Sequence, residues 1–175
     1  MGGWIKSAFN WVGELIMGRS RHLTPEEEAE MRKIYGDKID YSKVKIIDGA
    51  KKGLWGWILT SGGAAVTWGS RIYFPEGKYT FDKSPGWLAH EMGHHYQYKQ
   101  DGWGYTVKSV WGQLTKGKSF YDYTLEPGKK FGDYNVEQQA ELIEHYYQIQ
   151  NGTRSATPEE RAMYEQIMAG EGLFQ

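Results

Sequence analysis

Apolar residues recur at helical spacing near the start of the chain, in residues 1–20. The apolar positions there are Ile5, Ala8, Phe9, Val12, Leu15 and Ile16. Polar residues, including Lys6 and Glu14, interrupt this stretch, which argues against a secretory signal peptide and against a membrane span. The spacing predicts an amphipathic N-terminal helix that docks on the domain, and binding to a membrane surface or a partner is the alternative.

Helix-start signals mark further helices along the chain. Thr24-Pro25-Glu26-Glu27 combines an N-cap, a proline at the first helical position and a capping-box glutamate. The same four residue types recur at 157–160, and they open a helix in the C-terminal extension, residues 153–175. Together with starts at Pro85 and Asn135, these signals predict helices over about 25–35, 85–100 and 136–150 and after residue 157.

Short runs of β-branched and aromatic residues lie between the first two of these helices, separated by turns that contain glycine or proline. The runs are 44–47, 57–60, 65–68, 71–74 and 78–81. Residues 101–133 are rich in glycine and aromatics, and we expect a long loop with short strands there. The pattern predicts one α+β domain over residues 1–175, with a small antiparallel or mixed sheet packed on helices.

Charge and cysteine content narrow the chemistry. The formal net charge is −1 and no long basic run is present, so the sequence does not favour nucleic-acid binding. The chain has no cysteine, which excludes disulfides, a cysteine nucleophile and a cysteine-ligated zinc site. Any metal must therefore be held by carboxylates and by some of the five histidines.

The second predicted helix carries His90-Glu91-Met92-Gly93-His94, which is the pattern H-E-x-x-H. Residues four apart on a helix share a face, so His90 and His94 can bind one zinc ion. Glu91 then lies beside the metal without binding it and can take a proton from the metal-bound water. The alternative is a surface helix with two incidental histidines.

A catalytic zinc usually has a third protein ligand and an open position. The metzincin pattern needs glycine and histidine where this chain has Gln97 and Gln100, so that class is disfavoured. The third predicted helix instead supplies Glu137 and Glu141 on one face. We predict that Glu137 is the third ligand and that Glu141 orients a histidine ring, although exchanged roles, or two solvated acids, remain alternatives.

Several other residues are candidates for supporting roles. Peptide hydrolysis needs a donor for the developing oxyanion, and the sequence does not choose among Tyr134, His145, Tyr146 and Arg154. We expect His95 to be a supporting or surface residue, His145 to lie on the Glu137 side of its helix and His22 to be exposed. The strand 71–74 is the candidate edge for pairing with an extended substrate.

The H-E-x-x-H motif and the segment Tyr134-Asn135-Val136-Glu137-Gln138-Gln139-Ala140-Glu141 resemble the Vgr-related zinc metallopeptidases. The segments Tyr41-Ser42-Lys43-Val44 and Ile72-Tyr73-Phe74-Pro75 share this resemblance, which covers about residues 23–152. Members occur alone or as C-terminal toxin domains of type VI secretion spike proteins. The resemblance implies a bacterial, zincin-like peptidase in which His90, His94 and Glu137 bind Zn²⁺ and Glu91 is the catalytic acid and base.

The leading hypothesis is therefore a zinc metallopeptidase that cleaves a protein or peptide and acts as an antibacterial effector. Because no pro-segment is evident, we expect control by narrow specificity, export or an immunity protein. The resemblance also implies association with a spike protein, secretion by a type VI system and action in the target-cell periplasm, although no spike segment is present. The alternatives are a metal-stabilised binding module with little activity and an amidase that acts on cell-wall peptides.

Overall fold

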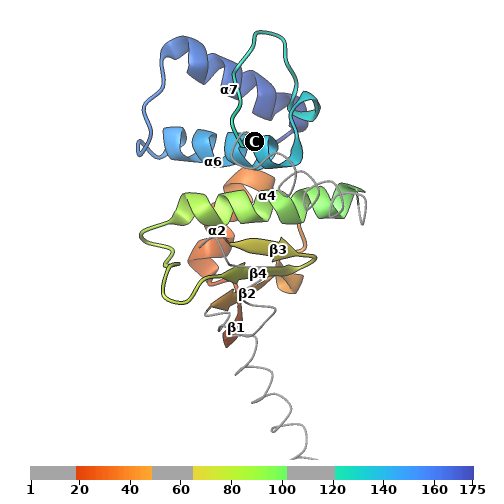
Figure 1. The fold of residues 1–175 in the computed structure, drawn as a ribbon, viewed down its shortest axis with the longest axis vertical. Coiled ribbons are helices and arrows are strands. Elements are labelled where there is room, and N and C mark those ends of the chain that lie inside the picture. Colours follow the sequence, from red (N-terminus) through yellow and green to blue (C-terminus); the bar gives the residue numbers. More distant parts are fainter. Residues whose placement is uncertain (1–18, 49–64, 102–120) are drawn as a thin grey trace, which may run out of the picture.

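The computed structural model describes residues 19–48, 65–101 and 121–175, which form an α+β fold in stacked layers (Figure 1). The four strands are β1 (Arg19–His22), β2 (Lys45–Asp48), β3 (Val66–Trp68) and β4 (Arg71–Phe74). The helices are α2 (Pro25–Tyr35), α4 (Pro85–Asp101), α6 (Val136–Gln150) and α7 (Pro158–Glu171). Two short 3-10 helices span Tyr41–Lys43 and Phe131–Asp133.

The strands form one mixed sheet in the order β1-β2-β4-β3. β1 pairs antiparallel with β2, β2 pairs parallel with β4, and β4 pairs antiparallel with β3. The register places Ile46 beside Ile72, and both side chains are fully buried. β3 therefore forms one edge of the described sheet, and β4 lies inside it.

The helix-start signals act as the sequence predicts. Thr24 and Glu27 form a reciprocal capping box at α2, and Thr157 and Glu160 form another at α7. The Asn135 side chain accepts hydrogen bonds from two backbone N–H groups at the start of α6. Each cap satisfies N–H groups that have no partner inside the helix, and so it fixes where the helix begins.

The helices lie over one another above the sheet. α4 lies along β3, α6 packs on α4, and α7 packs on α6 on the side away from the sheet (Figure 1). Buried apolar residues from α2, the sheet and these three helices form one continuous core. Among them, Met92 faces this core from the H-E-x-x-H helix. The α4–α6 interface therefore lies deep in the molecule, although α4 carries polar motif residues.

Some expectations from the sequence differ from the structure. Residues 78–81 form no strand, because the Tyr79 ring stacks on Phe74 at 3.9 Å and its hydroxyl donates to Glu27. The segment Arg19–His22, for which the sequence predicted no strand, is β1. Residues 19 and 20 of the expected N-terminal helix belong to this strand, and its other residues lie outside the described part. The run 57–60 and residues 102–120 of the expected loop also lie outside it.

Within the described ranges, no helix combines the length and the apolar character needed to cross a membrane.

Candidate metal centre

Helix α4 places three motif side chains in the interior. His90, Glu91 and His94 are 8%, 3% and 6% exposed. The Nε2 atoms of His90 and His94 lie 3.2 Å apart, and the two rings are nearly perpendicular. The four-residue spacing on a helix thus brings both imidazoles to one point, as the sequence predicts.

Helix α6 brings Glu137 to the same point. Its Oε2 atom lies 3.2 Å from His94 Nε2 and 3.7 Å from His90 Nε2. Glu137 is in the first turn of α6, where the Asn135 side chain accepts a hydrogen bond from its backbone N–H. The partial positive charge at a helix N-terminus favours a carboxylate at this position, although the side chain is only 2% exposed.

Gly93 allows the two helices to approach closely enough for this convergence. A Cβ atom at Gly93 would lie 3.3 Å from Ile143 Cδ1 and 3.5 Å from Ala140 Cα, both on α6. Even the smallest side chain at this position would require Ile143 to move by a few tenths of an ångström. The glycine inside the H-E-x-x-H motif therefore has a packing role of its own.

The three ligand atoms fit a tetrahedral divalent cation. Ligands at about 2.0–2.1 Å from a tetrahedral zinc lie about 3.3 Å from one another. The observed separations are 3.2, 3.2 and 3.7 Å, so a small shift of His90 or Glu137 makes the triangle regular. Two imidazoles and one carboxylate are the donor set of many catalytic zinc sites, and they leave a fourth position for water or substrate.

The charges in this cluster are strongly coupled. Burial favours the neutral form of Glu137, but His94 and His90 outweigh it and hold its pKa well below the ordinary value. Burial likewise disfavours a charged His94, and Glu137 outweighs it and raises the pKa of that ring. A cation that binds here must displace these protons, so binding should weaken as the pH falls.

Gln97 orients the ring of His94. The Nδ1 atom of His94 lies 3.0 Å from Gln97 Oε1, which can only accept, so Nδ1 carries the proton and Nε2 is left as the metal ligand. The Gln97 amide donates in turn to the Val136 carbonyl and to Gln139, both at 2.8 Å. These hydrogen bonds connect His94 to the first turns of helix α6, which carries Glu137.

The other ring faces two carboxylates of α6. His90 Nδ1 lies 3.3 Å from Glu144 Oε2 and 4.0 Å from Glu141 Oε1, although neither makes a well-oriented hydrogen bond in the described structure. The nearer Glu144 is also held by Gln148, which donates to its other oxygen at 2.9 Å. Glu141, expected to orient a histidine of the metal site, lies 3.1 Å from His145 Nε2 instead.

Glu91 is buried beside the cluster and anchored from the sheet. Its Oε2 atom accepts a hydrogen bond of 2.8 Å from the hydroxyl of Thr67 on β3. Burial raises the pKa of Glu91, while His94, His90 and Thr67 act in the opposite direction. A carboxylate of this kind is suited to accept and release a proton.

A cavity of about 510 Å³ lies between α6, α7 and residues 121–125, and none of the four buried residues of the centre lines it. Glu141 and Tyr121 line it. Burial raises the pKa of Tyr121 to about 12, and the nearby charges of Glu137, Glu91 and Glu141 contribute. Tyr121 therefore keeps its proton at neutral pH.

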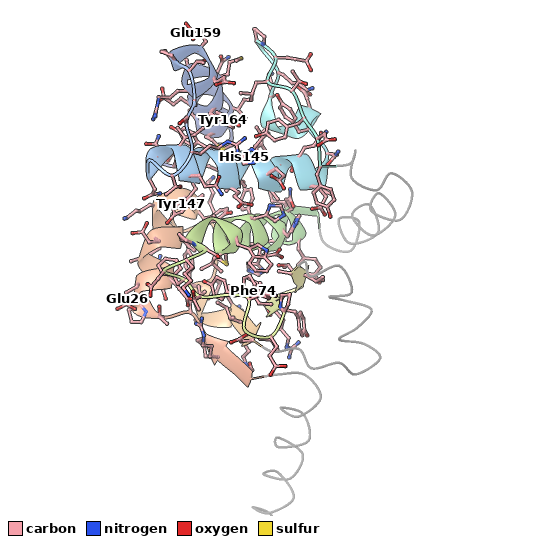
Figure 2. The ribbon with its side chains drawn as sticks, turned by 60° about the vertical axis from the view of Figure 1, so that its left-hand side comes forward. Glu26, Phe74, His145, Tyr147, Glu159 and Tyr164 are labelled. Carbon is pink, nitrogen blue, oxygen red and sulfur yellow. The ribbon has the colours of Figure 1, made fainter. Side chains whose placement is uncertain are left out.

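A row of hydrogen bonds forms one wall of this cavity. Beyond Glu141 and His145, the row continues through the hydroxyl of Tyr123 to that of Tyr164, 2.6 Å away. His145 on α6 and Tyr164 on α7 lie between the two helices (Figure 2). Both ring nitrogens of His145 are thus engaged within the protein.

This geometry separates the oxyanion candidates. Tyr134 is 3% exposed and donates to a carbonyl, and the Tyr146 hydroxyl accepts from Gln150. His145 is also engaged at both ring nitrogens, whereas Arg154 lines the cavity. The expectation for the substrate-pairing strand is wrong, because 71–74 is β4, which already has neighbours on both sides.

The remaining histidines lie outside the cluster. His95 is buried and its Nδ1 hydrogen-bonds the Gly69 carbonyl at 2.7 Å, so it supports the packing of α4 on the β3–β4 turn. His22 is exposed on β1, as expected.

The sequence did not indicate that four further residues belong to the site. They are Thr67, Gln97, Tyr121 and Glu144. Glu144 and Gln97 had a usable signal, since each is close in helical position to a proposed ligand. Thr67 and Tyr121 had none, because they come from a strand and a loop far from the motif.

The fold and the site together define an α+β protein with a buried His–His–Glu cluster that could hold a divalent cation. No protein-family model matches the chain. The chain is 29% identical over 168 residues to the type VI secretion system spike protein VgrG2b of Pseudomonas aeruginosa. This match covers 86% of the chain but only 15% of the spike protein.

A solved structure is similar over almost the whole chain. The effector domain of Pseudomonas aeruginosa VgrG2b matches with a TM-score of 0.64 and 27% identity, covering 94% of this chain and 92% of that one. Both comparisons support the resemblance to Vgr-related proteins and similarity to a type VI secretion effector. The zincin-like fold and the peptidase activity stay predictions.

Proposed function

We propose that this chain is a zinc-dependent peptidase in which His90, His94 and Glu137 bind the metal and Glu91 is the general base. The observation that carries the proposal is the convergence of two Nε2 atoms and one carboxylate oxygen within 3.7 Å of one another in the interior. A buried carboxylate in the adjacent motif position completes the set needed for hydrolysis.

Zinc bound at this site would lower the pKa of a water molecule toward neutrality and polarise the substrate carbonyl. Glu91 Oε1 makes no hydrogen bond with any described residue, whereas its Oε2 is held by Thr67. Oε1 is therefore the atom that takes a proton from the attacking water and passes it to the leaving nitrogen.

The similarity to an effector domain supports a role as a type VI secretion effector with a protein or peptide substrate. On this proposal, a spike protein delivers the chain, its site of action is the target-cell periplasm and an immunity protein protects the producing cell. Three ligand atoms converge among the described residues, which favours an open catalytic site over the closed, four-ligand site of a purely structural module. An amidase acting on cell-wall peptides would use the same site, and a substrate screen separates it from a peptidase.

Glu91→Gln tests the activity, with Glu159→Gln as the control for loss of one carboxylate at an exposed position of α7. We expect Glu91→Gln to keep its zinc and to lower kcat by about 10²- to 10⁴-fold in a peptide-cleavage assay, because proton transfer by a positioned base contributes about this much. Glu159→Gln should match the parent. Equal activity in the parent and Glu91→Gln would remove Glu91 from the mechanism.

A further inference from the structure

The contact between Thr67 and Glu91 connects two regions that are remote in sequence and chemically different. Thr67 is on β3, at the edge of the described sheet, and Glu91 is on α4. The Thr67 Oγ1 atom lies 2.8 Å from Glu91 Oε2 and 3.1 Å from the backbone carbonyl oxygen of the same residue. One hydroxyl group thus reaches both the side chain and the main chain of Glu91.

The hydroxyl has a single proton to donate. The shorter contact is to the carboxylate, and hydrogen bonds to charged acceptors are stronger than those to neutral ones. The proton is therefore best assigned to Oε2, with the backbone carbonyl as a secondary acceptor. Both contacts limit rotation of the Glu91 side chain, because its far end is fixed relative to its own backbone.

The burial of Glu91 makes its hydrogen bond with Thr67 hard for water to replace. Glu91 is 3% exposed, so bulk water does not readily replace the Thr67 hydrogen bond. The contact also leaves the two carboxylate oxygens unequal: Oε2 is held by Thr67, whereas Oε1 has no hydrogen-bond partner in residues 19–48, 65–101 and 121–175. A base with one fixed and one available oxygen presents a defined atom to the reacting water.

We propose that Thr67 is the positioning residue for the general base: its hydroxyl holds Glu91 Oε2 so that Oε1 faces the reacting water. This inference rests on the proposed function. Among the described residues, the Thr67 hydroxyl hydrogen-bonds Glu91 and none of the three proposed ligands, so on this proposal it acts through Glu91. Strand β3 therefore contributes to catalysis as well as to the sheet.

Thr67→Val tests the inference, because valine keeps the branched shape and the strand preference but lacks the hydroxyl. Thr67→Ser is the matched rescue, since it restores the donor. We expect Thr67→Val to lower kcat by about 10- to 100-fold with KM unchanged, since small displacements of a catalytic group cost about this much. Thr67→Ser should stay within about 3-fold of the parent by the same reasoning. Thr67→Val should also shift the acidic limb of the pH–rate profile. Loss of a contact that only holds α4 to the sheet would leave that profile unchanged.

His95→Gln provides a control for loss of packing between α4 and the sheet. The ring of His95 holds α4 to the β3–β4 turn through the Gly69 carbonyl, and among the described residues it makes no side-chain hydrogen bond to the Glu91 carboxylate. This variant should lose thermal stability but keep the parent kcat. If His95→Gln and Thr67→Val lower kcat equally, Thr67 only helps to hold α4 against the sheet, and the inference is overturned.

A binding measurement keeps the test independent of turnover. A small hydroxamate chelates zinc and donates a hydrogen bond to the neighbouring carboxylate, so its affinity depends on where Glu91 lies. By calorimetry on the zinc-loaded protein, Thr67→Val should bind acetohydroxamate about 10-fold more weakly, with unchanged zinc content. Parent-like kcat and hydroxamate affinity in Thr67→Val would overturn the inference, even with Glu91→Gln inactive. An inactive parent would instead refute the proposed function, and the hydroxamate result would still decide the role of Thr67.

Discussion

Two buried carboxylates in this protein have opposite surroundings. Glu27, in the first turn of α2, receives four hydrogen bonds: two from Arg21, one from the Thr24 backbone N–H and one from the Tyr79 hydroxyl. Glu137, in the first turn of α6, instead faces the Nε2 atoms of two imidazoles whose neutral form offers a lone pair there. Both carboxylates are almost fully buried, at 0% and 1% exposed.

The difference indicates what each site is for. Around Glu27 the protein supplies donors for both oxygens, so the carboxylate is satisfied without any other group. Around Glu137, the Gln97 contact directs the lone pair of His94 towards the carboxylate, so acceptor atoms converge. A bound proton or a bound cation relieves the repulsion between these acceptor atoms. The first arrangement stabilises the fold, and the second is suited to bind a metal.

The largest expected effect comes from changing the carboxylate at the metal centre. Glu137→Gln should lose stoichiometric zinc, measured by elemental analysis after dialysis, because a neutral amide replaces the anionic ligand. Glu27→Gln should keep one zinc per chain. Stoichiometric zinc in Glu137→Gln would show that another residue is the third ligand.

The second effect concerns stability. Glu27→Gln should lower the free energy of unfolding by about 2 kcal/mol in urea titrations, because the buried carboxylate loses its charge-assisted hydrogen bonds with the partly exposed Arg21. Arg21 first, then Thr24 and Tyr79, overcome the effect of burial and lower the pKa of Glu27 below its ordinary value of 4.5. The stabilisation is therefore full above pH 4.5 and is lost as the pH falls through the lowered value.

The parent and Glu27→Gln should accordingly differ by a constant amount near neutral pH and converge in acid. A gap that is independent of pH would show that Glu27 stabilises the protein through packing and not through its charge.

The smallest effect separates the two carboxylates that face His90. Glu144→Gln should weaken zinc binding by about 10- to 100-fold in a chelator competition, the usual cost of losing the partner of a ligand ring. Glu141→Gln is the matched control, since Glu141 is farther from His90 Nδ1 and lies close to His145. A larger loss in Glu141→Gln would reverse this assignment.

Local signals made most of the helical framework predictable. The caps at Thr24, Asn135 and Thr157 act within four residues of the chain, so sequence alone located three helix starts to the residue. The H-E-x-x-H spacing likewise placed His90 and His94 on one face. The one-domain organisation stays a prediction.

Long-range packing decided what the sequence could not. Strand β1 forms because it pairs with β2, and β4 is internal because the parallel β2 lies beside it, which no local pattern indicates. Thr67 and Tyr121 reach the centre through the tertiary fold. The choice of Glu144 over Glu141 as the nearer partner of His90 depends on less than 1 Å, which helical spacing cannot resolve.

Anomalous diffraction at the zinc edge, from crystals of the zinc-loaded chain, would show directly which atoms bind the metal. We expect one strong peak, about 2.0–2.2 Å from the Nε2 atoms of His90 and His94 and from a carboxylate oxygen of Glu137. A stoichiometric zinc bound elsewhere, or bound to both histidines with Glu137 turned away, would show that these three residues are not the ligand set.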